Sequence, residues 1–418
     1  MITEFGEENK MKVCFLAPEL YPIWGGGGTY AIGLLKYLPK DVEVYVLATQ
    51  RKVPEDKSTS KESSMSFLGD NIHVYNLADE KDTFFSHANF QRLCYNWIPK
   101  LNKEHHFDII HSQHQPMSDI LLKLLSKNFR YITTVHETFS RRNKAIKESN
   151  VGFEGFESSE KWMVSLSPFL KTIEKLYMRK SHAFISPSKW MRNVLHEDFN
   201  IPPSNVRVVY NGVDHRKFSP RSKRSEFIQK IYDEAGGPIV LFSGRMISTK
   251  GIHVLVKAMP KVIKEVKDAH FVFTGGGNSR PYRQMIDQMK IPSRNYNFVG
   301  YIRDFEDLPG LYSIASVFAA PTLYENFPFR VLENMSCQNA IVATKIVGIP
   351  EMITDGFNGL LVPPSNSDKL AEKIIELIND RALAKKLGQN ARRTIEEQFT
   401  FQIFANKTKD AYMWVTNN

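Results

Sequence analysis

The sequence has few of the features that mark membrane-spanning or secreted proteins. No apolar run in its 418 residues approaches the roughly 18 residues needed to span a bilayer. Its first residues, MITEFGEENK, are acidic and contain no apolar stretch, so we do not expect a signal peptide. The three cysteines, Cys14, Cys94 and Cys337, lie far apart, show no metal-ligand spacing and cannot all pair. These absences favour a protein of the reducing cytoplasm.

Motifs for nucleic acids and for dinucleotide cofactors are also missing. The net charge of +10 is not gathered into a basic tail or an aromatic-interleaved basic stripe, which argues against a nucleic-acid partner. The glycine run Gly25–Gly28 does not have the G-x-G-x-x-G spacing of a dinucleotide site. We therefore expect no dinucleotide cofactor.

One local excess of positive charge lies in residues 123–147. Within this segment a single carboxylate, Glu137, faces the cations Lys123, Lys127, Arg130, Arg141, Arg142, Lys144 and Lys147. Such a segment can be an ordinary solvated surface, or it can meet an anionic acceptor or a membrane surface. Both interpretations stay open, and the second makes peripheral membrane contact a candidate partnership.

The length of the chain predicts two domains, because 418 residues exceed what one compact core usually holds. Apolar runs typical of buried strands alternate with helical patterns, which predicts doubly wound α/β domains. The expected strands occupy residues 12–17, 42–48, 72–75, 107–111, 131–135, 183–186, 271–274, 297–300, 317–320, 340–343 and 360–362, and the second domain is expected to begin with IVLFSGR at 239–245. We place the domain change near Asn211-Gly212, a pair that serves as a turn or hinge. The expected domains are 1–213, together with about 400–418, and 214–399.

Two polar stretches are expected to be loops. Residues 51–70 are rich in serine and charge, which favours a mobile loop. Residues 141–161 follow the end of an expected strand, where open α/β sheets place their ligands. This second stretch is either an acceptor loop or lid, or plain disorder.

The glycine run follows the first expected strand and precedes a helical pattern that starts at Thr29. A strand, a glycine-rich loop and a helix together let a phosphate approach the backbone, although a flexible turn has the same appearance. Gly26 and Gly27 are therefore candidate donor-binding residues.

Residues 318–336, FAAPTLYENFPFRVLENMS, organise the second half of the chain. A short strand breaks at Pro321, and a helix is expected to begin near Pro328. Glu325 then lies beside the helix N-terminus, and Glu333 lies eight residues further on. Two spaced carboxylates and an anion-binding helix end suit a sugar nucleotide, which presents hydroxyls, phosphate and further hydroxyls. Alternatively, Glu325 caps the helix and Glu333 faces solvent.

Three motifs in order resemble those of the retaining family 4 glycosyltransferases. The pair Glu325 and Glu333 is similar to the family's E-x7-E element, GRMISTKG at 244–251 to its phosphate-binding segment, and GIPEMITDGFNGLLVPP at 348–364 to the segment that follows. The resemblance implies the GT-B fold, with two Rossmann-like doubly wound domains facing across a cleft and a C-terminal helix crossing back to the first domain. It also implies an acceptor-side first domain and a nucleotide-sugar-binding second domain.

The resemblance further implies roles for individual residues. Arg245 and Lys250 would hold the diphosphate of an NDP-sugar, Glu325 the donor sugar and Glu333 the ribose. His136, in TTVHET, matches a family histidine that touches the donor sugar, although a lone histidine at a strand end can also be structural. The remaining implied contacts, to the sugar, phosphate or nucleobase, come from Asn326, Phe327, Gly276 and Ile302.

The implied reaction is hexosyl transfer to a glycan, lipid or small-molecule acceptor with retention at the anomeric carbon. No D-x-D pair occurs, so we expect no metal at the diphosphate and no cofactor besides the donor. Two departures lie beside the implied pocket. The family's C-G-x-P-V is here Cys337-Gln338-Asn339-Ala340-Ile341, and a glycine pair is reduced to Gly348, preceded by Val347. They leave open two rivals: a sugar-nucleotide epimerase, and a non-catalytic module that binds nucleotide and scaffolds other transferases.

Overall fold

The computed structural model describes residues 10–21, 25–51, 66–80, 84–115, 117–125, 129–149, 151, 155–221, 224–302 and 306–417. Most of the loop expected at 51–70 lies outside these ranges. The chain divides into two compact units. Unit 1 contains residues 1–137, 173–212 and 401–418, and unit 2 contains residues 138–172 and 213–400.

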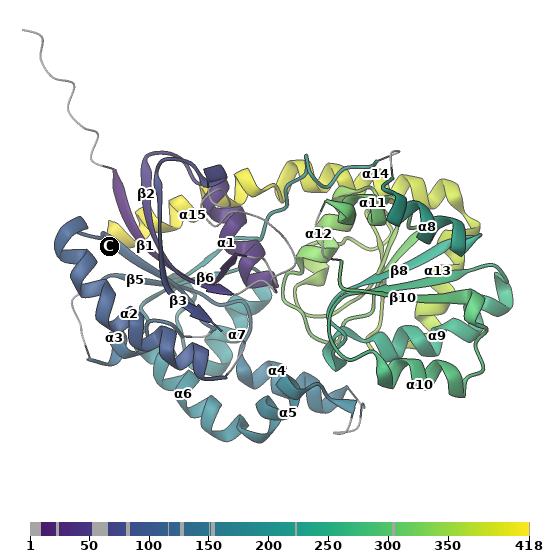
Figure 1. The fold of residues 1–418 in the computed structure, drawn as a ribbon, viewed down its shortest axis with the longest axis horizontal. Helices are drawn as coiled ribbons and strands as arrows, with labels where there is room; N and C mark the ends of the chain where they lie inside the picture. Colours follow the sequence, from purple (N-terminus) through teal and green to yellow (C-terminus); the bar gives the residue numbers. More distant parts are fainter. Residues whose placement is uncertain are drawn as a thin grey trace, which may run out of the picture. The chain divides into compact units, whose positions relative to one another are not determined.

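Unit 1 is built on a seven-stranded parallel sheet with the strand order β3-β2-β1-β4-β5-β6-β7 (Figure 1). The strands are β1 (Met11–Tyr21), β2 (Val42–Arg51), β3 (Ile72–Glu80), β4 (Ile109–Gln113), β5 (Tyr131–Thr134), β6 (Ala183–Ser186) and β7 (Val206–Val208). Every residue of β4, β5 and β6 is buried, as expected for parallel strands covered on both faces. The order reverses between β1 and β4, and open α/β sheets bind ligands at such a switch point.

The helices of unit 1 are α1 (Gly26–Tyr37), α2 (Phe84–His105), α3 (Ile120–Leu125), α7 (Lys189–Phe199) and α15 (Phe401–Thr416). Helix α6 (Ser167–Arg179) begins in unit 2 and ends in unit 1, because the boundary lies between Thr172 and Ile173. Helix α15 packs on α1 and β4, so the final helix returns to the first unit.

Unit 2 has a six-stranded parallel sheet with the order β10-β9-β8-β11-β12-β13. Its strands are β8 (Ile239–Ser243), β9 (His270–Thr274), β10 (Tyr296–Gly300), β11 (Val317–Ala320), β12 (Ile341–Thr344) and β13 (Leu360–Val362). Here the order reverses between β8 and β11, the two strands that precede the phosphate-binding motif and the two-glutamate motif.

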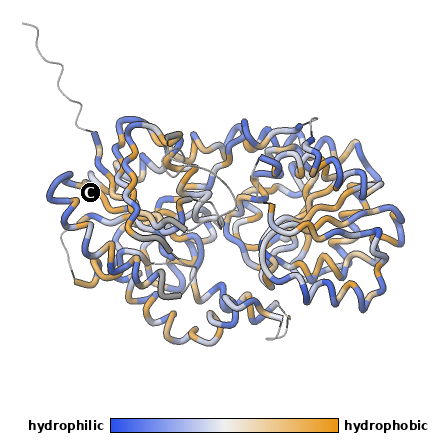
Figure 2. Tube along the Cα trace, in the orientation of Figure 1, coloured by the Kyte–Doolittle hydropathy of each residue, from blue (hydrophilic) through white to orange (hydrophobic). Residues whose placement is uncertain are grey.

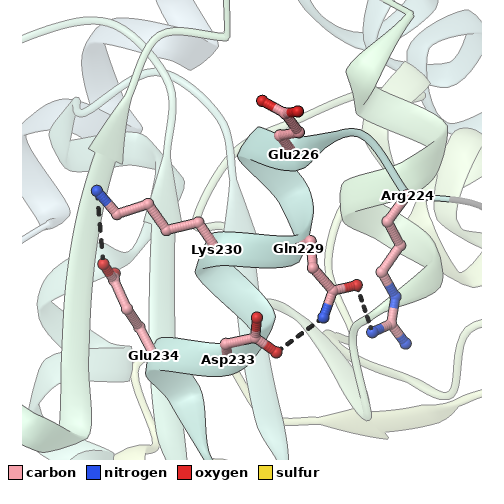
Figure 3. Close-up of a pocket in the computed structure, with 6 residues that line it drawn as sticks. All are labelled: Arg224, Glu226, Gln229, Lys230, Asp233 and Glu234. Atoms are coloured by element: carbon pink, nitrogen blue, oxygen red, sulfur yellow. Dashed lines mark hydrogen bonds and ion pairs between the residues drawn. The ribbon is translucent and has the colours of Figure 1, made fainter.

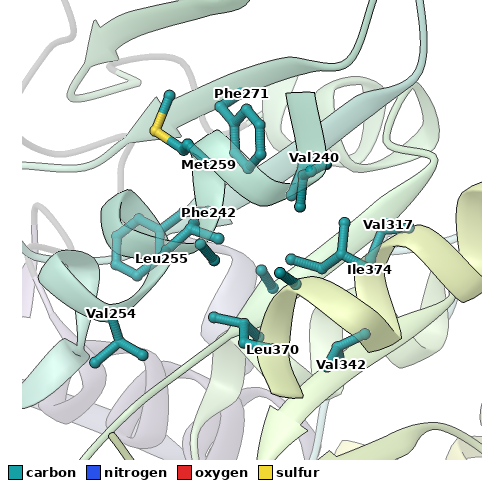
Figure 4. Close-up of a cluster of buried hydrophobic side chains, with 14 of the residues drawn as sticks. Val240, Phe242, Val254, Leu255, Met259, Phe271, Val317, Val342, Leu370 and Ile374 are labelled. Atoms are coloured by element: carbon teal, nitrogen blue, oxygen red, sulfur yellow. The ribbon is translucent and has the colours of Figure 1, made fainter. Parts of the chain in front are cut away.

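The helices of unit 2 come from both of its chain segments, 138–172 and 213–400. They are α4 (Phe139–Glu148), α5 (Ser158–Ser165), α8 (Glu226–Ala235), α9 (Ile252–Glu265), α10 (Arg280–Gln288), α11 (Asp307–Ser313), α12 (Phe329–Ser336), α13 (Ser367–Asn379) and α14 (Arg381–Gln398). Apolar side chains of α9 and α13 meet those of the sheet in one buried cluster (Figure 4). Figure 2 shows the same distribution along the trace, with hydrophobic strands and hydrophilic outer helix faces.

The two parallel sheets confirm the expected GT-B-type α/β architecture. Three expected strands, at 183–186, 317–320 and 360–362, coincide with β6, β11 and β13 residue for residue. The expectation of a loop at 141–161 was wrong, because α4 and α5 cover most of the described part of this stretch. No helix among the described residues is long and apolar enough to cross a membrane.

Candidate active site

The phosphate-binding motif packs against the loop that follows β11. Gly251 has φ +68°, and a Cβ built on it would lie 1.9 Å from the carbonyl oxygen of Pro321, so no larger residue fits without displacement. The carbonyl of Thr249 accepts hydrogen bonds from the backbone N–H of Leu323 at 2.8 Å and from the Thr322 hydroxyl at 3.0 Å. These contacts fix the two motifs relative to each other.

This packing brings together two of the expected site residues. The ammonium of Lys250 lies 2.5 Å from Oε1 of Glu325, and both side chains keep part of their surface exposed. Lys250 ends a short 3₁₀ turn, Ser248–Lys250, which follows β8 after Gly244 and Arg245. A cation and a carboxylate therefore stand side by side at the carboxyl ends of β8 and β11.

Arg245 points to a different carboxylate. Its Nη2 lies 2.6 Å from Oε2 of Glu157, the residue that caps the N-terminus of α5. The Arg245 side chain is 49% exposed, so an anion from solvent can reach it. Both expected phosphate cations are thus paired with carboxylates of this chain.

Asn326 and Phe327 are buried at the start of α12. The ring of Phe327 packs edge-on against Phe399 at 5.3 Å between centroids. A Cβ on Gly348 would lie 1.9 Å from the carbonyl of Asn326, so the remaining glycine of the family's pair is required by close backbone packing. Contacts of Asn326 and Phe327 to a donor would have to come mainly from their backbone.

Glu333 is buried on α12. The alternative interpretation of the sequence, in which Glu333 faces solvent, was therefore wrong. The Tyr312 hydroxyl donates a hydrogen bond to its Oε2 at 2.8 Å. Burial raises the pKa of Glu333, and the nearby Arg330 and the Tyr312 hydrogen bond oppose that rise. Arg330 in turn donates to the hydroxyl of Ser243, the last residue of β8.

The expected nucleobase-binding turns meet at the ends of β8, β9 and β10. The N–H of Gly275 donates to the carbonyl of Gly300 at 2.8 Å, and the N–H of Met246 donates to the carbonyl of Gly276 at 2.7 Å. Ile302 is buried two residues further on. Gly276 and Ile302 therefore lie on hydrogen-bonded neighbouring segments next to the phosphate-binding motif.

The other expected site residues belong to unit 1. Gly26 and Gly27 form the first turn of α1, and a Cβ on Gly27 would lie 3.6 Å from both Glu19 Oε2 and Gln113 Oε1. That spacing is an ordinary contact, so Gly27 is not required for lack of room. The turn lies beside the ends of β1 and β4, at the switch point of the sheet.

His136 follows β5 and stacks edge-on against Tyr30 of α1, with 4.6 Å between ring centroids. Burial lowers the pKa of His136 to about 4, so its imidazole is neutral at neutral pH. His111 is different, because it links β4 to β5 through a hydrogen bond to the Thr134 hydroxyl at 2.8 Å and to α15 through one to the Tyr412 hydroxyl at 2.7 Å. Its contacts are those of a structural histidine.

Both residues that replace a family glycine have left-handed backbone conformations. Gln338 has φ +62° and Val347 has φ +55°. Only glycine adopts this region without cost, and a β-branched residue there is a marked outlier. The departures noted in the sequence thus lie at backbone positions that favour glycine.

The basic segment 123–147 is not one continuous positive surface. Lys123 is buried in unit 1 and forms an ion pair with Asp119 at 2.9 Å and hydrogen bonds to Thr133 and Ser181. Lys123 therefore cannot meet an external anion, whereas Lys144 and Lys147 are exposed on α4. Lys127 lies outside the described residues.

Sequence reasoning missed three charged residues of this site: Arg330, Glu157 and Glu160. Arg330 stands one helical turn before Glu333, a spacing that pairs side chains on one helix face and could have drawn attention to it. Glu160 is fully buried and contacts Ser248, 88 residues away in sequence. No local signal in the sequence reveals that contact.

A hollow on the surface of unit 2 contains none of these residues. It is lined by α8 and the residues before it: Arg224, Glu226, Gln229, Lys230, Asp233 and Glu234 (Figure 3). Several of these side chains already bond to one another, as Gln229 does to Asp233 at 2.7 Å. Among the described residues no cluster of His, Cys, Asp and Glu could hold a metal ion.

Comparison with known families places both halves of the chain. The model of glycosyl transferases group 1 matches residues 223–394, and that of glycosyltransferase family 4 matches residues 24–217. Alpha-maltose-1-phosphate synthase of Mycobacterium tuberculosis is 25% identical over 426 residues, which cover 96% of this chain and 99% of the relative. An uncharacterized glycosyltransferase of Methanocaldococcus jannaschii is 28% identical over 249 residues, 59% of this chain and 63% of the relative.

Solved structures share the fold over nearly the whole chain. Sucrose-phosphate synthase from Thermosynechococcus elongatus has a TM-score of 0.76 at 20% identity and covers 98% of this chain and 100% of its own. Anabaena HepE in complex with UDP-glucose has a TM-score of 0.71 at 17% identity, with 97% and 100% covered.

Proposed function

We propose that this chain, which belongs to family 4 of the GT-B glycosyltransferases, transfers a hexosyl group from an NDP-sugar donor, with retention of configuration, to a glycan, lipid or small-molecule acceptor. The pair of Lys250 and Glu325, 2.5 Å apart, carries the proposal. In an NDP-sugar the diphosphate and the sugar hydroxyls are adjacent, so a cation for one and a carboxylate for the other must be neighbours as well.

The proposed roles follow from the resemblance to family 4 and, for the two cations, also from their charge. Arg245 grips the diphosphate with its planar guanidinium, and Lys250 adds a point charge. These two cations stabilise the departing diphosphate. In our proposal the cations take the place of a metal ion. Glu325 holds the sugar hydroxyls, Glu333 holds the ribose, and His136 contacts the sugar.

Substitution of the cations tests the phosphate assignment. Arg245→Ala and Lys250→Ala should each weaken NDP binding by about 2 kcal/mol, the typical contribution of a hydrogen bond to a charged group. Calorimetry with UDP, GDP and ADP measures this loss, and Lys230→Ala on α8 is the control, because Lys230 pairs with Glu234 on an exposed face. Unchanged NDP affinity in both variants would show that Arg245 and Lys250 do not bind the diphosphate.

Substitutions of Glu325 and Glu333 should have different effects on NDP affinity and on turnover. Glu325→Gln should mainly reduce turnover, since it alters the hold on the sugar, and Glu333→Gln should mainly weaken binding of NDP without sugar. The two-role scheme fails if Glu325→Gln weakens bare NDP as much as Glu333→Gln does.

The rival functions differ in product. Incubated with its donor alone, a transferase slowly releases free NDP, an epimerase yields the epimeric NDP-sugar, and a scaffold yields neither. The anomeric configuration of the glycosylated product, read by NMR coupling constants, then tests retention.

We also propose that the positive surface of α4 lies near an anionic lipid surface, together with the apolar side chains of α5 and α6. Trp162 on α5 and Phe169 on α6 are each 64% exposed, and Lys144 and Lys147 on α4 and Lys171 on α6 are also exposed. Exposed aromatics among lysines suit the interface of an anionic bilayer.

Vesicle co-sedimentation tests this contact. The protein should sediment with phosphatidylcholine vesicles that contain phosphatidylglycerol and not with phosphatidylcholine alone. Trp162→Ala with Phe169→Ala should abolish the binding, and Trp97→Ala, which changes an exposed tryptophan of α2, should not. Equal binding to both vesicle types, or full binding by the double variant, contradicts the proposal.

A further inference from the structure

The first turn of α5 carries two carboxylates that reach the phosphate-binding motif. Glu157 pairs with Arg245 at 2.6 Å, and Glu160 accepts hydrogen bonds from the N–H and the hydroxyl of Ser248, at 3.1 Å and 2.5 Å. The two contacts lie at either end of the short run 245–248. The stretch that the sequence marked as a loop is therefore attached to the motif expected to hold the diphosphate.

Glu160 joins two backbone segments through one buried side chain. Its Oε1 accepts both hydrogen bonds from Ser248, and its Oε2 accepts the N–H of Glu157 at 3.1 Å, which completes a capping box at the start of α5. The residue is fully buried. A buried carboxylate with three donors fixes the geometry of what it touches, because losing any donor leaves a buried acceptor unsatisfied.

Glu157, unlike the buried Glu160, holds Arg245 in a partly exposed ion pair. Its Oε2 also accepts the Ser159 hydroxyl at 2.9 Å, and the Glu157 side chain remains 21% exposed, beside a half-exposed guanidinium. A carboxylate and a phosphate offer a guanidinium the same planar pair of acceptors. A diphosphate that reaches Arg245 must therefore displace Glu157 or be repelled by it.

We propose that the first turn of α5 is part of the donor site, with Glu160 as a positioning residue for Ser248–Lys250 and Glu157 as a carboxylate that the donor diphosphate displaces from Arg245. The inference rests on the proposed function, because it takes Arg245 and Lys250 as the phosphate ligands. It predicts opposite effects for two substitutions of the same kind, three residues apart. Removing the charge of Glu157 strengthens phosphate binding, and removing that of Glu160 weakens it.

Calorimetry with inorganic pyrophosphate and with UDP, GDP and ADP tests the proposal. Glu157→Gln should bind tighter by about threefold to fivefold, since an exposed competing ion pair is lost. Glu160→Gln should bind about tenfold weaker, the effect of losing one hydrogen bond to a charged group. Glu148→Gln, which removes an exposed carboxylate of α4, is the matched control and should not change affinity.

Ser248→Ala tests the same contact from the other side. It removes the hydroxyl and keeps the backbone N–H, so it should weaken pyrophosphate binding less than Glu160→Gln does. The double variant should bind pyrophosphate as tightly as Glu160→Gln alone, because both changes remove the same contact. In turnover assays Glu160→Gln should raise the donor KM more than it lowers kcat. A purely structural role would lower the amount of folded enzyme and leave the KM unchanged.

The outcomes separate this inference from the proposed function. If Arg245→Ala and Lys250→Ala leave pyrophosphate affinity unchanged, the phosphate assignment itself is wrong. Suppose instead that those variants bind pyrophosphate weakly. The role of α5 is then overturned, and the phosphate assignment stands, if Glu157→Gln binds no tighter than the wild type, or if Glu160→Gln and Ser248→Ala each bind as tightly as the wild type.

Discussion

At the scale of single residues, Val347 is a β-branched residue in the left-handed backbone region, where such side chains are least favoured. It has φ +55°, next to Gly348, whose position is forced by contact with Asn326. Residues held in such sparsely populated regions cost of order 1–3 kcal/mol each. The strain lies beside the buried start of α12, the helix that carries Glu333.

Val347→Gly should therefore raise the free energy of unfolding by about 1 kcal/mol, because relief of the strain exceeds the extra chain entropy of glycine. Urea denaturation measures the change. Ile346→Gly is the control, since Ile346 is the preceding β-branched residue without a positive φ, and it should lower stability. A stability loss in Val347→Gly equal to that of the control would show that the conformation carries no strain.

His111 gives the fold a dependence on pH. Burial lowers the pKa of His111 to about 3, with smaller contributions from the charges of His136 and Lys123. Below the ordinary pKa of histidine, near 6.5, the unfolded chain binds a proton that the folded protein does not, so stability falls as pH drops from there towards 3. By pH 5 this one group should remove about 2 kcal/mol.

Urea denaturation at pH 7 and pH 5 checks this expectation. His111→Gln should be less stable than the wild type at both pH values, and it should lose about 2 kcal/mol less between them. An identical loss in both proteins would assign the pH dependence to other groups.

At the scale of elements, burial explains which parts of the fold the sequence predicts. Strands such as β6 and β11 consist of apolar runs that only a buried sheet accommodates, so their bounds were predictable. The helices α4 and α5 were not, because their polar sequence is typical of a loop. Their order comes from contacts distant in sequence, including the hydrogen bond from Asn143 to Ser167 at 2.7 Å and the contact of Glu160 with Ser248.

The same reasoning applies to the candidate site. Arg245 and Lys250 follow β8, and Glu325 and Glu333 follow β11, in contiguous motifs with fixed spacing, so their placement after these two neighbouring strands was predictable. Glu157 and Glu160 take their places through tertiary contacts that no local pattern encodes, whereas the spacing of Arg330 from Glu333 on α12 is a local signal.

The packing of α1 on α15 depends on a missing side chain. A Cβ on Gly33 would lie 2.0 Å from the Phe401 ring, so Gly33→Ala should displace α15 and destabilise unit 1 by about 1–3 kcal/mol. Thermal denaturation measures the loss. Gly310→Ala in α11 is the matched control, because its nearest neighbour lies at 3.6 Å and alanine favours a helix.

Replacing Phe401 by leucine in the Gly33→Ala background should restore part of the stability, since it removes the ring that alanine meets. No loss in Gly33→Ala, or no recovery in the double variant, would contradict this account of the packing.

At the scale of the whole molecule, the proposed nucleotide contacts are concentrated in unit 2. Bare NDP should therefore slow amide hydrogen exchange at 244–251, 274–277 and 322–336, because ligand binding stabilises the segments that it contacts. The strands β2 and β3 of unit 1 should exchange at unchanged rates. Mass spectrometry of peptic fragments measures both, and uniform protection of the two units would refute the assignment of nucleotide binding to unit 2.

The return of α15 to unit 1 has a consequence for the order of synthesis. Unit 1 is interrupted by residues 138–172 and 213–400, and its core includes Tyr412, which bonds to His111 at 2.7 Å. On the ribosome, all of unit 2 emerges before α15 does, so unit 2 can reach its native state while the earlier-made sheet of unit 1 still lacks a covering helix. Exposed apolar surface of this kind is what chaperones bind during translation. A nascent chain paused before residue 401 should therefore depend on them more than the completed protein does.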